Sequence, residues 1–112
     1  MNFSDRFSED TVAKVVDYMQ ATDDATAELK AQVARSKYLA ELSEAFAFKA
    51  LSVGSIPDKQ AEVQMDPTVQ AKWELHFQAI AAYEKARATR ERGQLIFDGW
   101  RTASSNKRQG MV

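Results

Sequence analysis

The chain has 112 residues, of which 45% are hydrophobic and 28% charged, which is the composition of one ordinary globular domain. It contains no cysteine, which excludes disulfides, thiolate metal sites and cysteine catalysis. No apolar run approaches the roughly 20 residues of a transmembrane helix, so we expect no contact with a membrane. The first residues lack the basic start and apolar stretch of a secretory signal, and we expect a cytoplasmic protein.

The formal net charge of −1 is the sum of two segments with opposite signs. Residues 85–112 contain seven basic and two acidic residues, a net charge of +5. Residues 1–84 contain eight basic and 14 acidic residues, a net charge of −6. The total charge argues against a polyanionic partner, but the asymmetry leaves such a partner possible for the last quarter of the chain.

The first predicted element is a long helix that ends before residue 54. Its first turns carry apolar residues at the spacing of one helix face, and no glycine or proline occurs before residue 54. Residues 22–24 form either a short break, because Thr and Asp favour N-caps, or part of one continuous helix. The candidate N-caps of the helix are Ser4, Ser8 and Asp10.

A line of mostly apolar residues, spaced alternately three and four positions apart, forms a seam along this helix. The residues in the second half of the seam are small. Larger residues there, Leu39, Leu42 and Phe46, lie on the neighbouring stripe. We therefore predict close packing that turns around the helix, rather than one straight dimeric zipper. The seam consists of Val12, Val15, Met19, Thr22, Thr26, Leu29, Val33, Ser36, Ala40, Ser43, Ala47 and Ala50.

Residues 54–66 form the predicted connection between two long helices. Gly54 suits a helix C-cap, and Pro57 follows it as a stop signal. Residues 59–65 have the composition of a short helical turn. Asp66 followed by Pro67 is typical of an N-cap and the first residue of the next helix.

The second long helix is predicted from Pro67 to about Ala103, and residues 104–112 are predicted to form a flexible basic tail. Polar residues dominate positions 84–94, with an apolar face on either side of them. Either His76 or Phe77 belongs to the first part of that face. The other residues of the face are Val69, Trp73, Ile80, Tyr83, Leu95, Ile96, Phe97 and Trp100.

These elements predict an all-α fold in which two long helices form an antiparallel, coiled-coil-like hairpin within a single domain of residues 1–103. Two long helices cannot enclose a thick core, so part of each apolar face stays in water unless another chain covers it. We therefore expect a homo-oligomer.

No pattern for catalysis, cofactor binding or metal binding is present, and we expect a protein that is not an enzyme and has no cofactor. The phosphate-binding glycine loop, the zinc-protease motif and the serine elbow are all missing from the sequence. His76 is the single histidine, and we interpret it as a packing or surface residue. Paired carboxylates are interpreted as solvated faces, because acid–base catalysis needs a cleft. These pairs are Glu9/Asp10, Asp23/Asp24 and Glu41/Glu44.

The basic residues of the last quarter, with a tryptophan among them, match what single-stranded nucleic acid requires, namely phosphate neutralisation and base stacking. The alternative is that these residues are solvated or pair with the acidic first half of a neighbouring chain, which Glu84 and Glu91 support. The candidate nucleic-acid-binding residues are Lys85, Arg87, Arg90, Arg92, Trp100, Arg101, Lys107 and Arg108.

A set of aromatic, charged and small residues marks the last third of the chain: Tyr83, Glu84, Arg87, Arg90, Ile96, Trp100, Arg101, Ser105, Asn106, Arg108 and Gly110. This set resembles small uncharacterised helical proteins of tailed phages and prophages. In architecture and tail charge alone, the chain is similar to UvsY-type recombination mediators, small helical oligomers that bind single-stranded DNA and help load a recombinase.

The resemblance implies an accessory protein of DNA recombination or replication in the cytoplasm of a bacterial host. It would act as an oligomeric helical scaffold that contacts single-stranded DNA. The alternatives are a module that binds and inhibits or remodels a host protein, with a phage protein as another possible partner, and an assembly element of a virion.

Overall fold

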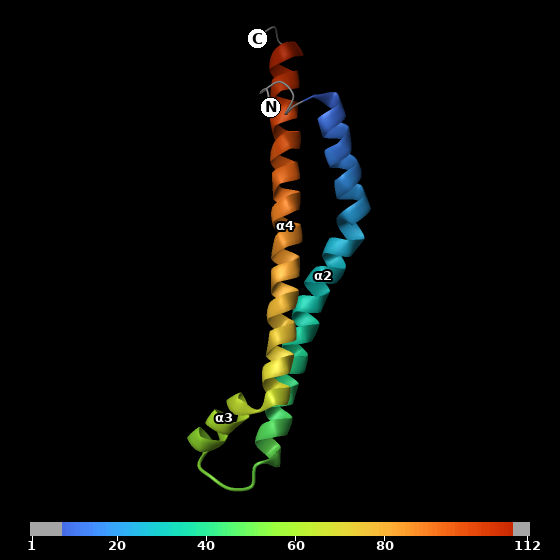
Figure 1. Ribbon diagram of the computed structural model, residues 1–112. Coiled ribbons are helices and arrows are strands. Elements are labelled where there is room, and N and C mark those ends of the chain that lie inside the picture. The colour runs from blue at the N-terminus through green and yellow to red at the C-terminus, as the bar shows by residue number, and fades with distance from the viewer. Residues whose placement is uncertain (1–7, 109–112) are drawn as a thin grey trace. The chain divides into compact units, whose positions relative to one another are not determined.

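The computed structural model describes residues 8–108, which form three helices (Figure 1). The predicted all-α fold with two long helices is confirmed. The short helix lies in the connection between the two long ones. The helices are α2 (Glu9–Ala50), α3 (Ile56–Met65) and α4 (Pro67–Arg108).

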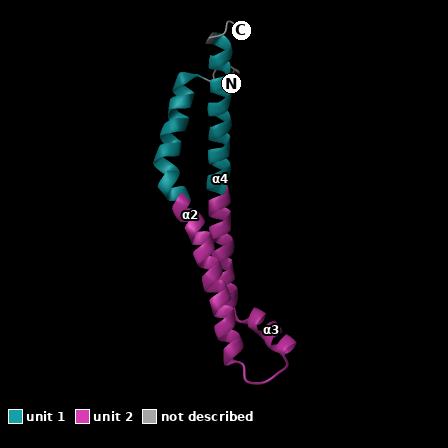
Figure 2. Cartoon of the chain, turned by 180° about the vertical axis from the view of Figure 1, so that it is seen from behind, with its two compact units in different colours: residues 1–26, 85–112 teal, residues 27–84 magenta. Residues whose placement is uncertain are grey.

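Two compact units divide the chain, and each contains a segment of α2 and a segment of α4 (Figure 2). Unit 1 consists of residues 1–26 and 85–112, and unit 2 of residues 27–84. Within each unit the two segments lie side by side and run antiparallel, which confirms the predicted hairpin. Unit 2 also contains α3.

Helix α2 begins after Ser8, one of the three predicted caps. The Ser8 hydroxyl accepts a hydrogen bond from the Thr11 backbone N–H at 3.2 Å, and the Ser8 carbonyl accepts from the Val12 N–H at 3.0 Å. Asp10 lies inside the first turn, where its negative charge complements the helix dipole. Ser4 lies outside the described residues.

Residues 22–24 do not interrupt α2. The hydroxyls of Thr22 and Thr26 donate to backbone carbonyls one turn earlier, those of Tyr18 (2.7 Å) and Thr22 (2.8 Å). A threonine that bonds back in this way is accommodated within a continuous helix. Of the two alternatives for this segment, the structure therefore shows the uninterrupted helix.

The seam of small residues stays on one face of α2 in unit 2. Ala40 is completely buried, whereas Leu39 and Leu42 are 41% and 37% exposed and Phe46 is 67% exposed. Packing within unit 2 therefore does not include these three larger residues. Small side chains keep the contact face because they allow the closest approach of two helices.

The connection contains more helix than predicted. Gly54 has a φ of 117°, a conformation that favours glycine, but α2 ends at Ala50, so Gly54 is not its C-cap. Ser55 caps α3 by accepting from the Asp58 N–H at 3.3 Å, and Pro57 lies in the first turn. The predicted helical turn at residues 59–65 thus begins three residues earlier.

The predicted start of α4 is confirmed, and its predicted end is wrong. Asp66 Oδ1 accepts from the N–H groups of Thr68 (2.8 Å) and Val69 (3.3 Å), and Pro67 is the first helical residue. The helix continues past Ala103 to residue 108, so the first five residues of the predicted tail are helical. Residues 109–112 lie outside the described residues.

The face of α4 that packs against α2 includes one of the two alternatives left open at residues 76 and 77, and it departs from the predicted apolar face at Leu95. His76 is buried (6% exposed) and Phe77 is 56% exposed, which decides between these two neighbours. Leu95 is 70% exposed, whereas Gly93 is buried within the polar stretch of the helix. The other residues of the predicted apolar face, from Val69 to Trp100, are buried or half-buried.

We expect Ala40→Leu to destabilise the protein by about 1–3 kcal/mol, because three additional carbon atoms have no space in this contact. Urea unfolding followed by circular dichroism measures the change. Ala31→Leu is the matched control, since Ala31 is exposed on the same helix and its substitution should change stability by less than about 0.5 kcal/mol. Equal effects of the two substitutions would contradict the close contact at Ala40.

Candidate nucleic-acid interface

In unit 1, helices α2 and α4 approach each other closely at Gly93. This glycine is buried, and a Cβ atom placed on it would lie 3.2 Å from Val15 Cγ1 and 3.8 Å from Met19 Sδ. The missing side chain therefore leaves room for Val15. Gly93 therefore lies on the face of α4 that meets α2, and position 90, three residues earlier, lies near the same face.

Arg90 is the basic residue that faces α2. Its Nη1 donates hydrogen bonds to the Met19 carbonyl and to Thr22 Oγ1, both at 3.0 Å. Its Nη2 donates to Asp23 Oδ1 at 2.5 Å and forms an ion pair there. The Thr22 hydroxyl donates its own proton to the Tyr18 carbonyl, which leaves its oxygen free to accept from Arg90.

The Arg90 contacts show that part of the basic quarter pairs with the acidic first quarter of the same chain. The Arg90 side chain is only 22% exposed, and its hydrogen bonds occupy both terminal nitrogens. The sequence left open whether basic residues pair with acidic ones, and expected such a pairing between neighbouring chains. For Arg90, the pairing lies within unit 1.

Arg87 and Arg92 lie on the surface of α4. Arg87 forms an ion pair with Glu91, one turn away, at 3.6 Å, and both side chains are more than half exposed. Exposed ion pairs of this kind contribute little to stability. Arg92 is exposed and donates to Thr89 Oγ1 at 3.4 Å. Both guanidinium groups are therefore accessible to an anion.

The exposed basic residues occupy two separate flanks of α4. Lys85 and Arg92 are seven residues apart and share one stripe of the helix. Arg87 and Arg101 are 14 residues apart and share another stripe, roughly 160° away around the helix axis. The predicted residues of unit 1 therefore form two basic stripes and no single basic face.

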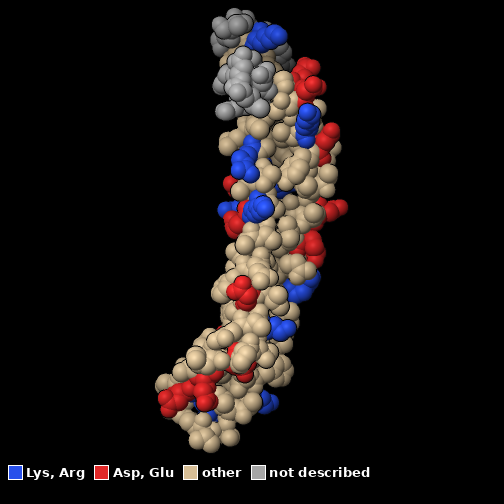
Figure 3. All heavy atoms as spheres, viewed as in Figure 1, with Lys and Arg blue, Asp and Glu red and all other residues tan. Residues whose placement is uncertain are grey.

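Acidic residues of α2 accompany these stripes within unit 1. Asp10, Asp17 and Asp24 are exposed and follow one another at intervals of seven residues, so they share one stripe of α2. In this unit Figure 3 shows mainly red atoms along α2, with blue atoms among them, and mainly blue atoms over α4, with red atoms beside them. The positive potential of α4 is thus partly cancelled in its own unit.

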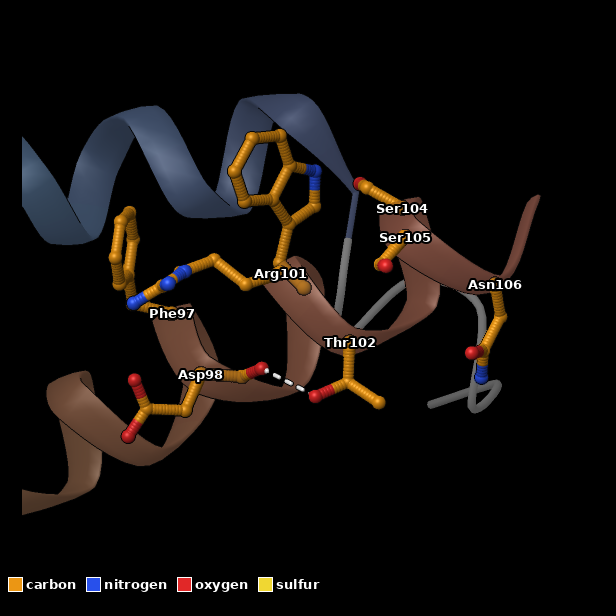
Figure 4. A pocket seen from close by; sticks show the side chains of 8 residues that line it. Phe97, Asp98, Arg101, Thr102, Ser104, Ser105 and Asn106 are labelled. Carbon is orange, nitrogen blue, oxygen red and sulfur yellow. Dashed lines mark hydrogen bonds between the residues drawn. The ribbon is translucent and has the colours of Figure 1, made fainter. Parts of the chain in front are cut away.

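An open groove runs beside the last turns of α4 (Figure 4). The rings of Phe97 and Trp100 lie 6.0 Å apart at an interplanar angle of 35°, and the Arg101 guanidinium lies 6.0 Å from the Phe97 centroid. Thr102 Oγ1 donates to the Asp98 carbonyl at 3.1 Å. The lining residues are Phe97, Asp98, Trp100, Arg101, Thr102, Ser104, Ser105 and Asn106.

Trp100 and Arg101 are thus the two predicted site residues that the structure brings together. Trp100 is half-buried, so only part of its indole is open for base stacking, whereas Arg101 is exposed. Lys107 is exposed near the end of the helix. Arg108 ends α4, and its side chain lies outside the description.

Sequence reasoning missed three residues that shape this region. Thr22 and Asp23 hold Arg90, and Phe97 lies below the Arg101 guanidinium. The position of Thr22 in the three-four seam was the one available indication of its role. Nothing in the sequence pattern distinguished Arg90 from the other arginines.

Unit 2 contains a buried polar contact at His76. Its Nδ1 lies 3.0 Å from Ser36 Oγ on α2. The Ser36 hydroxyl donates to the Val33 carbonyl at 3.1 Å, and its oxygen can accept from His76 Nδ1 in the tautomer that is protonated there. His76 therefore packs between the helices, which is one of the two roles predicted for it.

Glu44 joins all three helices of unit 2. Its Oε1 accepts hydrogen bonds from Trp73 Nε1 on α4 and, at 3.3 Å, from Gln64 Nε2 on α3. The carboxylate is half-buried. The prediction that Glu41 and Glu44 form a solvated pair is therefore wrong for Glu44, which has a structural role.

Comparison with known protein families, curated proteins and solved structures gave no match. The resemblance to phage helical proteins and to UvsY-type mediators therefore stays a prediction. Within residues 8–108, no helix is long and apolar enough to cross a membrane. The same residues contain no cluster of three or more side chains that could hold a metal ion.

We expect Arg90→Ala to destabilise the protein by about 1–2 kcal/mol, because the Met19 carbonyl and Thr22 lose a charged donor. The Asp23 carboxylate is exposed, so raising the salt concentration should remove only a small part of the difference. Urea unfolding at low and high salt measures both effects. The control is Arg92→Ala, which should change stability by less than about 0.5 kcal/mol; a loss as large as that of Arg90→Ala would refute the special role of Arg90.

Proposed function

We propose that this chain is a non-enzymatic helical scaffold that acts by self-association. One observation carries the proposal. Among residues 8–108, only four hydrophobic side chains are buried, whereas eleven large hydrophobic side chains are exposed. Many large apolar side chains are therefore only partly covered within the chain or not covered at all, and exposed apolar surface in excess of that on an ordinary monomer marks interaction sites.

The exposed apolar residues concentrate in unit 2. On α2 they include Leu39, Leu42 and Phe46, and on α4 Phe77, which is 56% exposed. A scaffold that assembles through such faces needs no catalytic group. The same faces would serve a module that binds a host protein or an element of a virion, and these remain the alternative proposals.

We expect the full chain to form concentration-dependent oligomers in sedimentation equilibrium. The double substitution Leu39→Gln with Phe46→Gln should weaken association while leaving helical content unchanged, because both side chains are exposed. Leu95→Gln is the matched control, since Leu95 is an exposed leucine in unit 1 and should leave association unchanged. A wild-type chain that stays monomeric at high micromolar concentration would rule out self-association.

A second candidate function is contact with single-stranded nucleic acid. It is favoured by four exposed basic residues in unit 1 that have no ion pair with any other described residue. Such residues can neutralise phosphates without first breaking an internal contact. They are Lys85, Arg92, Arg101 and Lys107. An accessory role in phage recombination or replication, in the cytoplasm of a bacterial host, belongs to this candidate.

We expect salt-sensitive binding of a fluorescent single-stranded oligonucleotide at low ionic strength. Lys85→Gln with Arg92→Gln, which remove one basic stripe, should weaken binding and reduce the slope of log K against log salt by about 1.4, since each phosphate contact on a single strand contributes about 0.7. Fluorescence anisotropy measures both quantities. Lys30→Gln with Lys37→Gln, exposed lysines of unit 2, serves as the control for net charge. Equal losses in the two double variants would show that no specific interface exists in unit 1.

A further inference from the structure

Helix α2 carries a second stripe in unit 2, beside the buried seam. It consists of Arg35, Leu39, Leu42, Phe46 and Lys49, and we name it the α2 stripe. These positions alternate in steps of four and three residues, and they cover about 80° of the helix surface. Three-four spacing of apolar residues is the pattern by which one helix packs along another.

No other part of unit 2 covers this stripe. Leu39 and Leu42 are 41% and 37% exposed, and Phe46 is 67% exposed, whereas Ala40 on the seam is fully buried. The helix therefore has one face packed against α4 and another face that is apolar and open.

We propose that a second copy of this chain covers the α2 stripe, with the two α2 helices antiparallel. This inference rests on the proposed self-association and specifies its contact. The charges of the stripe determine the direction. A parallel pair would place Arg35 against Arg35 and Lys49 against Lys49, and both contacts would bring like charges together.

An antiparallel pair removes both repulsions. With a two-fold axis between positions 39 and 42, Leu39 of each copy faces Leu42 of the other, which gives two central apolar layers. In the next layers outward, Arg35 faces Phe46 of the second copy. A guanidinium group over an aromatic ring is a favourable contact.

The outer ends of the pair are also complementary in charge. Lys49 of one copy lies beside Gln32 of the other and about one turn from Glu28. Glu28 is exposed and contacts Arg35 of its own chain at 3.6 Å. Lys49 is exposed and has no ion pair with any other described residue, so this contact gives it one. Glu28, just beyond the stripe of each copy, therefore lies near Lys49 of the other copy.

The register is tested with two charged variants of the full chain, Leu39→Glu and Leu42→Lys. Each variant alone places two charges against leucines and should weaken the wild-type dimer by roughly tenfold or more. In an equimolar mixture, position 39 of one variant faces position 42 of the other. One Glu–Lys layer and one Leu–Leu layer then form, so the mixture should recover a 1:1 dimer in sedimentation equilibrium.

The control mixture is Leu39→Glu with Phe46→Lys. The same two charges are present, but position 46 faces Arg35, so this mixture should not recover the dimer. Circular dichroism of each variant verifies that the exposed substitutions leave the helices folded.

The possible outcomes separate the inference from the proposed function. Recovery in the first mixture alone supports the antiparallel register. A wild-type dimer that both single variants leave intact, or that neither mixture recovers, overturns the α2 pairing but not self-association. A wild-type chain that remains monomeric overturns both, and the stripe would then belong to a different protein partner.

Discussion

The close contact of two long helices through small side chains is the constraint on which the rest of the molecule depends. Ala40 has no exposed surface, and at Gly93 the absent side chain leaves room for Val15. A face made of such residues brings two helices near to each other but buries little apolar area. Larger side chains such as Leu42 and Phe46 are consequently left outside. The apolar surface available for association is therefore a direct result of how the hairpin closes.

Polar contacts supply much of the specificity that a thin core cannot provide. In unit 1, Arg90 reaches a backbone carbonyl, Thr22 and Asp23, and in unit 2 Glu44 accepts from Trp73 on α4 and from α3. Such contacts fix the register of neighbouring helices because an unpaired polar group is costly to bury. Because Arg90 is held in these internal contacts, fewer basic residues remain to bind a ligand. Part of the opposite charge of the two segments is thus used in contacts within the fold, such as the ion pair between Arg90 and Asp23.

Local patterns allowed much of the fold to be predicted, and contacts between helices decided the rest. The cap at Asp66 and the small-residue seam were readable because both depend on residues close in sequence. The choice between His76 and Phe77 was open because the two positions differ by about 100° of helix rotation, which only the partner helix determines.

Arg90 was grouped with ligand-binding arginines because its internal role depends on Thr22 and Asp23, almost 70 residues away. The helix beyond Ala103 was missed because its first residues, two serines and an asparagine, have weak helical preference.

The central claim is that the apolar face left open by this close packing is an interface between copies. Spin labelling tests it directly, because the chain has no native cysteine and a label can be placed at one chosen position. Tyr38 is 63% exposed beside the α2 stripe, whereas Leu95 is 70% exposed in unit 1. Labelled Tyr38→Cys should show strong dipolar coupling between chains, and this coupling should disappear when excess unlabelled protein is added. Labelled Leu95→Cys should show much weaker coupling. Absence of intermolecular coupling at Tyr38→Cys, at concentrations where the chain is oligomeric, would contradict the account.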